Sequence, residues 1–290
     1  MMEKSFSDND LTVKIYTPDS PLKYPVRFIA EMFKDLVRGR ELAWRLAVRD
    51  ISAQYRQAAL GLLWAFILPL VNTITWIFLQ SSGVVGVSDT ALPYPVYVFT
   101  GTMIWAIFTE SFNAPLQVTT SAKPMLSKIN FPREALIMSG MLQGLFNAGI
   151  KVVILIAVLA VMGFINNFSI LLFPIALISL MLAGTALGLL VTPVGLLYSD
   201  IGKVIPLMMQ FLMYLTPVVF PMPKTGIAAT IFTYNPLTPL IMTARDWLTG
   251  TPATFLNGFL WVNLALVILL FLVWVIYKLA LPILIERMNA

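Results

Sequence analysis

Long apolar runs separated by short polar connections dominate the chain from residue 58 onward. A membrane-spanning helix needs ~20 consecutive, mostly apolar residues. Six runs approach or exceed this length: residues 58–80, 92–114, 135–163, 169–198, 204–220 and 255–278. The pair Asn166–Asn167 separates the third run from the fourth. The pattern predicts an all-α polytopic membrane protein with six transmembrane helices and a transmembrane domain over residues 58–290.

An amphipathic segment, residues 35–57, leads directly into the first run. Its apolar face consists of residues at 4-3-4 spacing: Trp44, Val48, Ile51 and Tyr55. Four arginines fall together on another face: Arg38, Arg45, Arg49 and Arg56. Such a helix lies in the headgroup plane with its apolar side toward the lipid. The segment is therefore predicted to be an interface helix, with an ordinary surface helix of a cytosolic domain as the alternative.

Residues 1–34 form a polar arm before this helix. Within the arm, Leu11–Tyr16 alternates apolar and polar residues as a short strand does. A poorly ordered terminus is the alternative for its first ten residues.

Lysine and arginine are distributed unevenly between alternate connections. Ten of them precede the first run. The connections on the same side add Lys123, Lys128, Arg133, Lys203, Lys278 and Arg287, whereas the opposite side holds Lys224 and Arg245. Cytoplasmic loops carry an excess of Lys and Arg. Both termini are therefore predicted to be cytoplasmic, and the net charge of +5 is attributed to topology rather than to nucleic-acid binding.

Two connections contain more than a loop. Residues 115–134, on the inside, hold a short helix-compatible piece between Pro124 and Pro132. Residues 221–254, on the outside, hold apolar pieces that are too short to cross a bilayer and are broken by prolines. Such pieces are typical of re-entrant or interfacial helices. The outer segment is predicted to be a hairpin that frames an exit.

Composition excludes several kinds of chemistry. The chain is 59% hydrophobic and 11% charged, whereas soluble domains carry about 25% charged residues. It has no Cys and no His, which removes thiolate chemistry and the commonest general base and metal ligand. It also lacks the GxxxxGK[ST] phosphate-binding loop. Active transport would therefore draw its energy from a gradient or from another chain.

Two ionisable residues and one small-residue motif lie within the apolar runs. Glu110 is close to the inner end of the second run and is expected to reach interfacial water. Lys151 lies deeper in the third run and could reach the outer headgroups, face a wet lumen or pair at an interface. Two scattered charges argue against a proton relay. Gly184 and Gly188 form a GxxxG motif that permits close helix packing.

Aromatic residues are dense in the first two runs. Interfacial aromatic belts are the ordinary explanation. The functional alternative is a channel lining on which sugar rings stack.

Four segments resemble the ABC-2 exporter permeases of lipid-linked polysaccharides. They are RDISAQYRQAALGLLWAFILPL, INFPREALI, YSDIGKVIPLMMQFLMYLTPVVFP and YNPLTPLIMTARDWL, in the family's order. The family includes O-antigen, capsule and teichoic acid permeases. The long arm before the interface helix looks most like the O-antigen type, which serves lipopolysaccharide synthesis. Lys151 matches no part of the family's pattern.

The resemblance implies an assembly and a set of site residues. It implies a homodimer in the cytoplasmic (inner) membrane with a continuous pore, two copies of an ATPase subunit that binds ATP and magnesium, and no cofactor or catalytic residue on this chain. Residues that would couple to the ATPase are Ser121, Lys123, Pro124, Met125, Leu126, Ser127, Lys128, Ser199 and Asp200. Channel-lining residues would be Trp76, Phe78, Tyr97, Phe99, Trp105, Phe108, Phe112, Phe211 and Tyr214. The outer gate would contain Pro221, Pro223, Tyr234, Pro236 and Pro239.

Two further functions remain as alternatives. An exporter of capsule, teichoic acid, drugs or lipids would share the fold. A membrane enzyme acting on lipid-linked sugars would need carboxylates that face a cavity. The runs offer only Glu110, because Asp89, Asp200 and Asp246 lie in separate connections.

Overall fold

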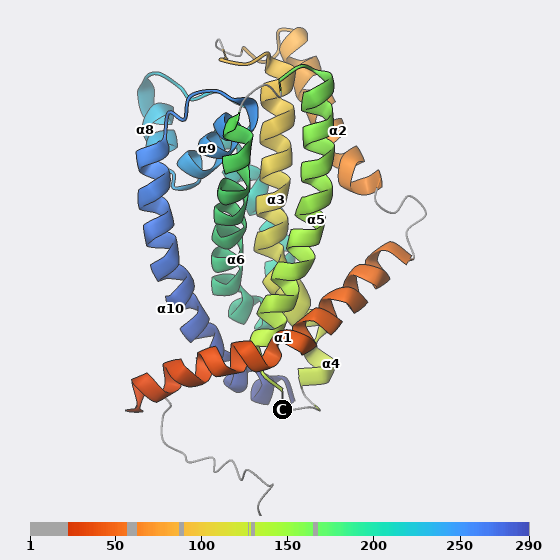
Figure 1. The fold of residues 1–290 in the computed structure, drawn as a ribbon, viewed down its shortest axis with the longest axis vertical. Helices are drawn as coiled ribbons and strands as arrows, with labels where there is room; N and C mark the ends of the chain where they lie inside the picture. The colour runs from red at the N-terminus through yellow and green to blue at the C-terminus, as the bar shows by residue number, and fades with distance from the viewer. Residues whose placement is uncertain are drawn as a thin grey trace, which may run out of the picture.

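A computed structural model describes residues 23–56, 63–86, 90–126, 128, 131–164 and 168–289. Every regular element in these residues is a helix, so the all-α prediction is confirmed for them (Figure 1). The predicted strand Leu11–Tyr16, the pair Asn166–Asn167, and residues 58–62 of the first run lie outside the described residues.

Within the described residues, three helical segments are long and apolar enough to cross a membrane. They are α5 (Glu134–Val161), the segment Phe168–Leu197 and residues Leu256–Leu284 of α10 (Leu256–Asn289). The second of these joins the short helix η3 (Phe168–Leu172) to α6 (Phe173–Leu197). They correspond to the third, fourth and sixth apolar runs. The first and second runs contribute α2 (Trp64–Ser81) and α3 (Tyr94–Ser121).

Helix α3 lies at the centre of the bundle and packs against α2, α5 and α6. Its closest approach is to α6. A Cβ atom placed on Gly184 would lie 2.7 Å from the Phe108 carbonyl oxygen, and one on Gly188 would lie 2.1 Å from the Phe112 carbonyl oxygen. Both distances are too short for any side chain. The GxxxG motif therefore brings the two backbones into direct contact, as the sequence pattern predicted.

The fifth apolar run, residues 204–220, is not one continuous helix. Helix α7 (Ile201–Tyr214) has 14 residues, and the chain turns without regular structure over 215–220. Proline at 217 disfavours helical geometry at Thr216, which explains where the helix ends. Apolar composition alone extended the predicted span too far.

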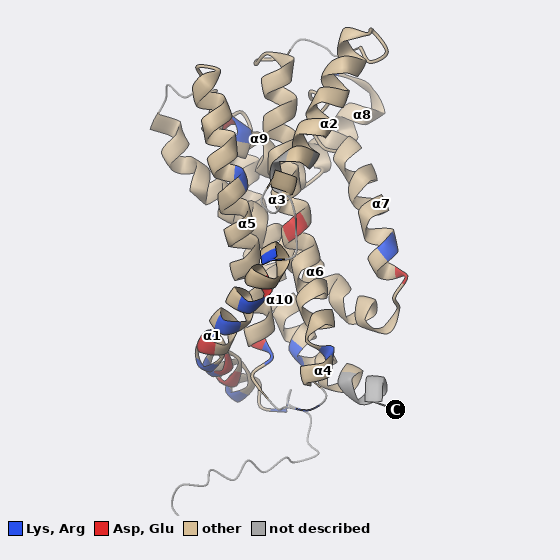
Figure 2. Ribbon diagram, turned by 90° about the vertical axis from the view of Figure 1, so that its right-hand side faces the viewer, with Lys and Arg blue, Asp and Glu red and all other residues tan. Residues whose placement is uncertain are grey.

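The remaining elements gather at the two ends of the bundle (Figure 1). Helix α1 (Pro25–Arg56) and α4 (Lys123–Leu126) lie at one end, near the last turns of α10. Helices α8 (Gly226–Tyr234) and α9 (Leu237–Thr249) lie at the other. Most charged positions are at the α1 end (Figure 2). The outer segment thus forms two helices too short to span a bilayer.

Helix α1 begins ten residues earlier than predicted and packs through a face that the prediction missed. Proline is tolerated in the first helical turn because its missing N–H needs no partner there. The buried face contains Phe28, Met32, Gly39, Ala43, Leu46 and Ala47. A Cβ atom on Gly39 would lie 3.2 Å from Cβ of Ala135, so α1 contacts the start of α5 closely. The predicted apolar face stays partly open, with Trp44 61% and Val48 45% exposed.

Candidate functional site

The segment predicted to contact an ATPase begins at Ser121, the last residue of α3, and one residue separates α3 from α4. Lys123 Nζ donates a hydrogen bond to the Leu196 carbonyl oxygen at 3.2 Å, which attaches α4 to the last turn of α6. Leu126 is buried in a cluster that also contains Leu46 of α1 and Leu281 of α10. Four helices are thereby joined to α4 at this end of the molecule, because α3 precedes it directly.

The other predicted coupling residues are mostly accessible. Ser121, Pro124, Lys128, Ser199 and Asp200 are exposed, and Met125 is half-buried. Asp200 pairs with Lys203 at 3.5 Å, with both side chains more than 80% exposed. Ser127 lies outside the described residues. This end therefore offers α4 and the start of α7 to a partner.

The first half of α1 is held to the bundle by a three-residue ion cluster. Lys278 Nζ on α10 lies 2.8 Å from Asp35 Oδ2 on α1 and 2.6 Å from Glu134 Oε1 on α5. Glu134 is 3% exposed. Burying an unpaired charge is costly, so these contacts fix the positions of three helices relative to one another.

The last turns of α1 are held by a second polar network. Gln143 Nε2 donates to Asp50 Oδ2 at 3.1 Å, and Tyr55 OH donates to Asn147 Oδ1 at 2.8 Å. Burial, followed by the charge of Glu110, raises the pKa of Tyr55 above its usual value. Tyr55 therefore stays a neutral donor at physiological pH.

Asn147 continues this network into the bundle. Its Nδ2 donates to Glu110 Oε1 at 2.5 Å, and Lys151 Nζ pairs with the other carboxylate oxygen of Glu110. Of the three possibilities for Lys151, the structure shows pairing at an interface, between α5 and α3. The expectation that Glu110 simply reaches interfacial water is thus replaced by a specific contact.

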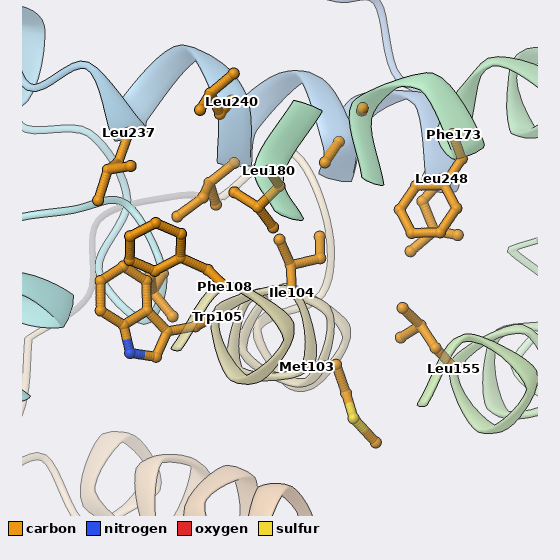
Figure 3. Close-up of a cluster of buried hydrophobic side chains, with 14 of the residues drawn as sticks. Met103, Ile104, Trp105, Phe108, Leu155, Phe173, Leu180, Leu237, Leu240 and Leu248 are labelled. Carbon is orange, nitrogen blue, oxygen red and sulfur yellow. The ribbon is translucent and has the colours of Figure 1, made fainter. Parts of the chain in front are cut away.

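The predicted channel aromatics fall into two groups. Those on α3 are buried within this chain: Tyr97, Phe99, Trp105, Phe108 and Phe112. Trp105 and Phe108 lie together beside the buried leucines of α6 and α9, with ring centroids 5.1 Å apart (Figure 3). Phe78 and Phe211 are 66% and 63% exposed. Trp76 packs edge-on against Tyr214 at 6.0 Å. Of the predicted channel aromatics, those on α2 and α7 offer an open surface within one chain.

Arg245 organises the opposite end of the molecule. It is 1% exposed, its Nη2 donates to the Val218 carbonyl oxygen at 2.9 Å, and its guanidinium lies 3.7 Å from the centre of the Tyr97 ring. A Cβ atom on Gly101 would lie 2.4 Å from Nη2, so glycine is needed there. Tyr97 OH also donates to the carbonyl oxygens of Pro217 and Phe220. Protein groups thus satisfy the non-helical backbone after α7, as burial requires.

Asp246 and the predicted outer-gate residues lie with Arg245 at the α8–α9 end of the molecule. Asp246 accepts hydrogen bonds from Thr251 Oγ1 at 2.9 Å and from Thr254 N at 3.3 Å. Burial nevertheless raises the pKa of the Asp246 carboxyl group. Pro239 is buried against Gly258, whereas Tyr234 is 83% exposed. Pro221 and Pro223 are half-buried and Pro236 is exposed.

Sequence reasoning missed several of these polar contacts. Asn147 and Asp35 were not singled out, and Arg245 was used only as an outside cation. One signal was available, since each polar side chain within an apolar run needs a partner inside the protein. Among the residues that the structure describes, no three acidic side chains come together as a metal site would require.

Comparison with known proteins gives two informative similarities. No family model matches the chain. The chain is 22% identical over 191 residues to the O-antigen export system permease protein RfbA of Myxococcus xanthus, covering 66% of this chain and 72% of that protein. It is 25% identical over 217 residues to the protein of the same name from Klebsiella pneumoniae, covering 72% and 78%. The resemblance to O-antigen permeases is thereby confirmed. With three apolar helices of spanning length, it indicates a multi-pass membrane protein.

Proposed function

We propose that this chain is the transmembrane subunit of an ABC exporter that moves a lipid-linked, O-antigen-type polysaccharide across the cytoplasmic membrane. ATP hydrolysis on a separate subunit drives the movement. The similarity to two O-antigen export permeases carries this proposal. The chain itself has no phosphate-binding loop, which is consistent with a separate motor.

The α1 end of the molecule is the proposed cytoplasmic side. It combines a 32-residue amphipathic helix, a short helix after α3 and most of the charged positions (Figure 2). An excess of basic residues marks the cytoplasmic side of membrane proteins. The ATPase would bind beneath α4 and the start of α7, and α1 would lie along the inner leaflet.

Two copies of the chain form the proposed pore. Six helices per copy would cross the membrane, with α7 and the turn after it completing the fifth crossing. The exposed rings of Phe78 and Phe211 would face the pore, where the apolar C–H faces of sugar rings could stack on them. Helices α8 and α9 would frame the outer exit. Closure of the ATPase dimer would move the coupling segments as rigid bodies and open the path.

Reconstitution tests the proposal directly. The chain is purified with its proposed partner ATPase and placed in liposomes that contain the lipid-linked glycan. We expect ATP-dependent appearance of glycan on the other side of the membrane and faster ATP hydrolysis when glycan is present. A complex whose ATPase carries a substitution of its phosphate-binding lysine is the control.

Two results would contradict the proposal. One is purification of this chain without any ATPase, which would remove the proposed motor. The other is a complex that hydrolyses ATP and moves a small drug or phospholipid but not the glycan.

A further inference from the structure

A cavity of about 360 Å³, with a few polar side chains in a mainly apolar lining, lies between the last turns of α1 and helices α2, α3 and α5. Its walls include Trp64, Asn72, Trp105, Glu110 and Asn147. Small-molecule sites typically measure about 300–1,000 Å³ and combine apolar walls with a few placed polar groups. The cavity is therefore large enough for one small ligand and too small for a stretch of polymer.

The cavity lies deep along the axis of the bundle, and Gln54, Trp64 and Asn72 on its walls are exposed. Glu110 is eleven residues before the end of α3, or about 17 Å of helix from Ser121 at a rise of 1.5 Å per residue. Lys151 and Asn147 are each 7% exposed. Polar side chains at this depth are costly unless they serve a partner or a ligand.

The charges in the cavity balance. Lys151 and Glu110 are the charged residues among those that line it, and they pair with each other. A phosphate or a free cation would have to compete with that pair. A neutral ligand with many hydroxyl groups would not, since it can hydrogen-bond to the pair as it stands.

Several polar groups in the cavity have hydrogen-bonding capacity to spare. Glu110 accepts one hydrogen bond on each oxygen, whereas a carboxylate offers about four acceptor sites. Asn72 is exposed, and the described part of the chain offers its side-chain amide no partner. Asn72 lies within the first apolar run, where an amide with no partner is unfavourable. A polar ligand in the cavity would supply the hydrogen bonds that the Asn72 amide lacks.

Two tryptophan side chains also line the cavity. Trp64 is 48% exposed, and Trp105 forms part of the wall. An aromatic face carries negative charge density and attracts the weakly positive C–H groups on one face of a pyranose ring. The exposed indole of Trp64, beside the Glu110 carboxylate and the Asn72 amide, provides the stacking face and the hydrogen-bonding groups that a sugar ring needs.

We propose that this cavity binds a single uncharged sugar ring of the exported glycan on the cytoplasmic side of the pore. The inference rests on the proposed function and adds a recognition site with named residues. The Glu110 carboxylate would accept hydrogen bonds from ring hydroxyls, and the Asn72 amide would both donate and accept them. Trp64 would stack on the ring. Lys151 and Asn147 would act as positioning residues that hold the Glu110 carboxylate in place.

Saturation-transfer NMR tests the site on the complex of this chain with its ATPase in detergent. The probes are glucose, galactose, rhamnose and N-acetylglucosamine. We expect saturation transfer to at least one of them, and binding about tenfold weaker in Asn72→Leu and Glu110→Gln, from the loss of one hydrogen bond to a charged or amide group. Gln80→Leu, an exposed amide on the same helix, and Trp261→Ala, an exposed indole on α10, are matched controls that should bind normally.

The outcomes separate this inference from the proposed function. Saturation transfer that is unchanged in Asn72→Leu, Glu110→Gln and Trp64→Ala would overturn the site, even if ATP-driven glycan movement is intact. Retention of a phospholipid headgroup in the cavity, displaced by lipid and not by sugar, would also overturn it. Site-dependent sugar binding without glycan movement would support the site and contradict the exporter proposal. Because Asn72 has no side-chain partner among the described residues, its leucine variant should fold even if Glu110→Gln does not.

Discussion

Single residues decide how closely the helices of this bundle approach. Gly188 allows the α6 backbone to contact the Phe112 carbonyl group, and Gly101 leaves room for the Arg245 guanidinium. Arg245 also donates a hydrogen bond to the Val218 carbonyl oxygen, in the non-helical segment that follows α7. In each case the missing or buried side chain, rather than a hydrophobic contact, fixes the geometry.

Gly188→Ala should destabilise the protein although alanine favours helices. A methyl group there would lie 2.1 Å from a backbone oxygen that cannot move aside, and overpacking of this kind costs about 1–3 kcal/mol. The higher helix propensity of alanine than of glycine stabilises the helix by only about 1 kcal/mol. Thermal unfolding in detergent measures the difference.

Gly149→Ala is the matched control for that substitution. Gly149 is also helical, but no atom lies within 4 Å of a Cβ atom placed on it. This variant should unfold at the same temperature or slightly higher. Equal destabilisation of the two variants would show that the α3–α6 contact is not as close as described.

At the scale of elements, α1 is fixed to the bundle at both ends by polar contacts. Asp35 pairs with Lys278 near its start, and Tyr55 bonds to Asn147 near its end. Between these points it packs through small residues on α5. Helix α1 therefore follows α5 and α10 in any movement of the bundle.

Lys278→Met should loosen this attachment. It leaves the buried Glu134 carboxylate without its cation, and breaking a buried pair costs about 3–5 kcal/mol. We expect a lower unfolding temperature and weaker stimulation of the partner ATPase by glycan. Adding Glu134→Gln and Asp35→Asn should restore much of the stability, because the unpaired charges are gone.

Arg45→Met provides the comparison. Arg45 pairs with Glu41 at 2.6 Å, but both side chains are 74% exposed, so solvent screens the pair and its loss should cost well under 1 kcal/mol. If Lys278→Met proved no more harmful than Arg45→Met, the three-residue cluster would not be what holds α1.

Most elements could be predicted from sequence, but their partners could not. The lengths of the apolar runs located the spans that became α5, α6 and α10, and hydrophobic periodicity marked the exposed arginines of α1. It missed the buried face of α1, because Gly39, Ala43 and Ala47 contribute little hydrophobic signal. The sequence singled out both Lys151 and Glu110 but did not predict that they pair, because that pairing depends on how two helices are rotated against each other.

At the scale of the whole molecule, the two ends differ in chemistry. The α1 end carries most of the charge, and the α8–α9 end buries Arg245 and Asp246 within the fold (Figure 2). The distribution of cations in the sequence predicted this polarity correctly in outline. Which end faces the cytoplasm stays a prediction that an accessibility experiment can test.

The chain has no cysteine, so single cysteines report topology without background. Lys128→Cys should react with a membrane-impermeant maleimide only after the inner side is opened. Lys224→Cys should react from the outside of intact cells. Both residues are exposed, so neither substitution should disturb packing. The reverse pattern of labelling would invert the proposed orientation.

The direct contact between α3 and α6 has a mechanical consequence. Side chains between helices act as a soft layer, because they can change rotamer and absorb a displacement. Here the backbones touch, so the two helices form one stiff lever about 42 Å long, the length of 28 residues at 1.5 Å each. One end of the lever is followed by α4, and near the other end Tyr97 OH donates a hydrogen bond to the Pro217 carbonyl oxygen after α7. A push applied at α4 therefore passes along α3 with no layer of side chains between α3 and α6 at Phe108 and Phe112.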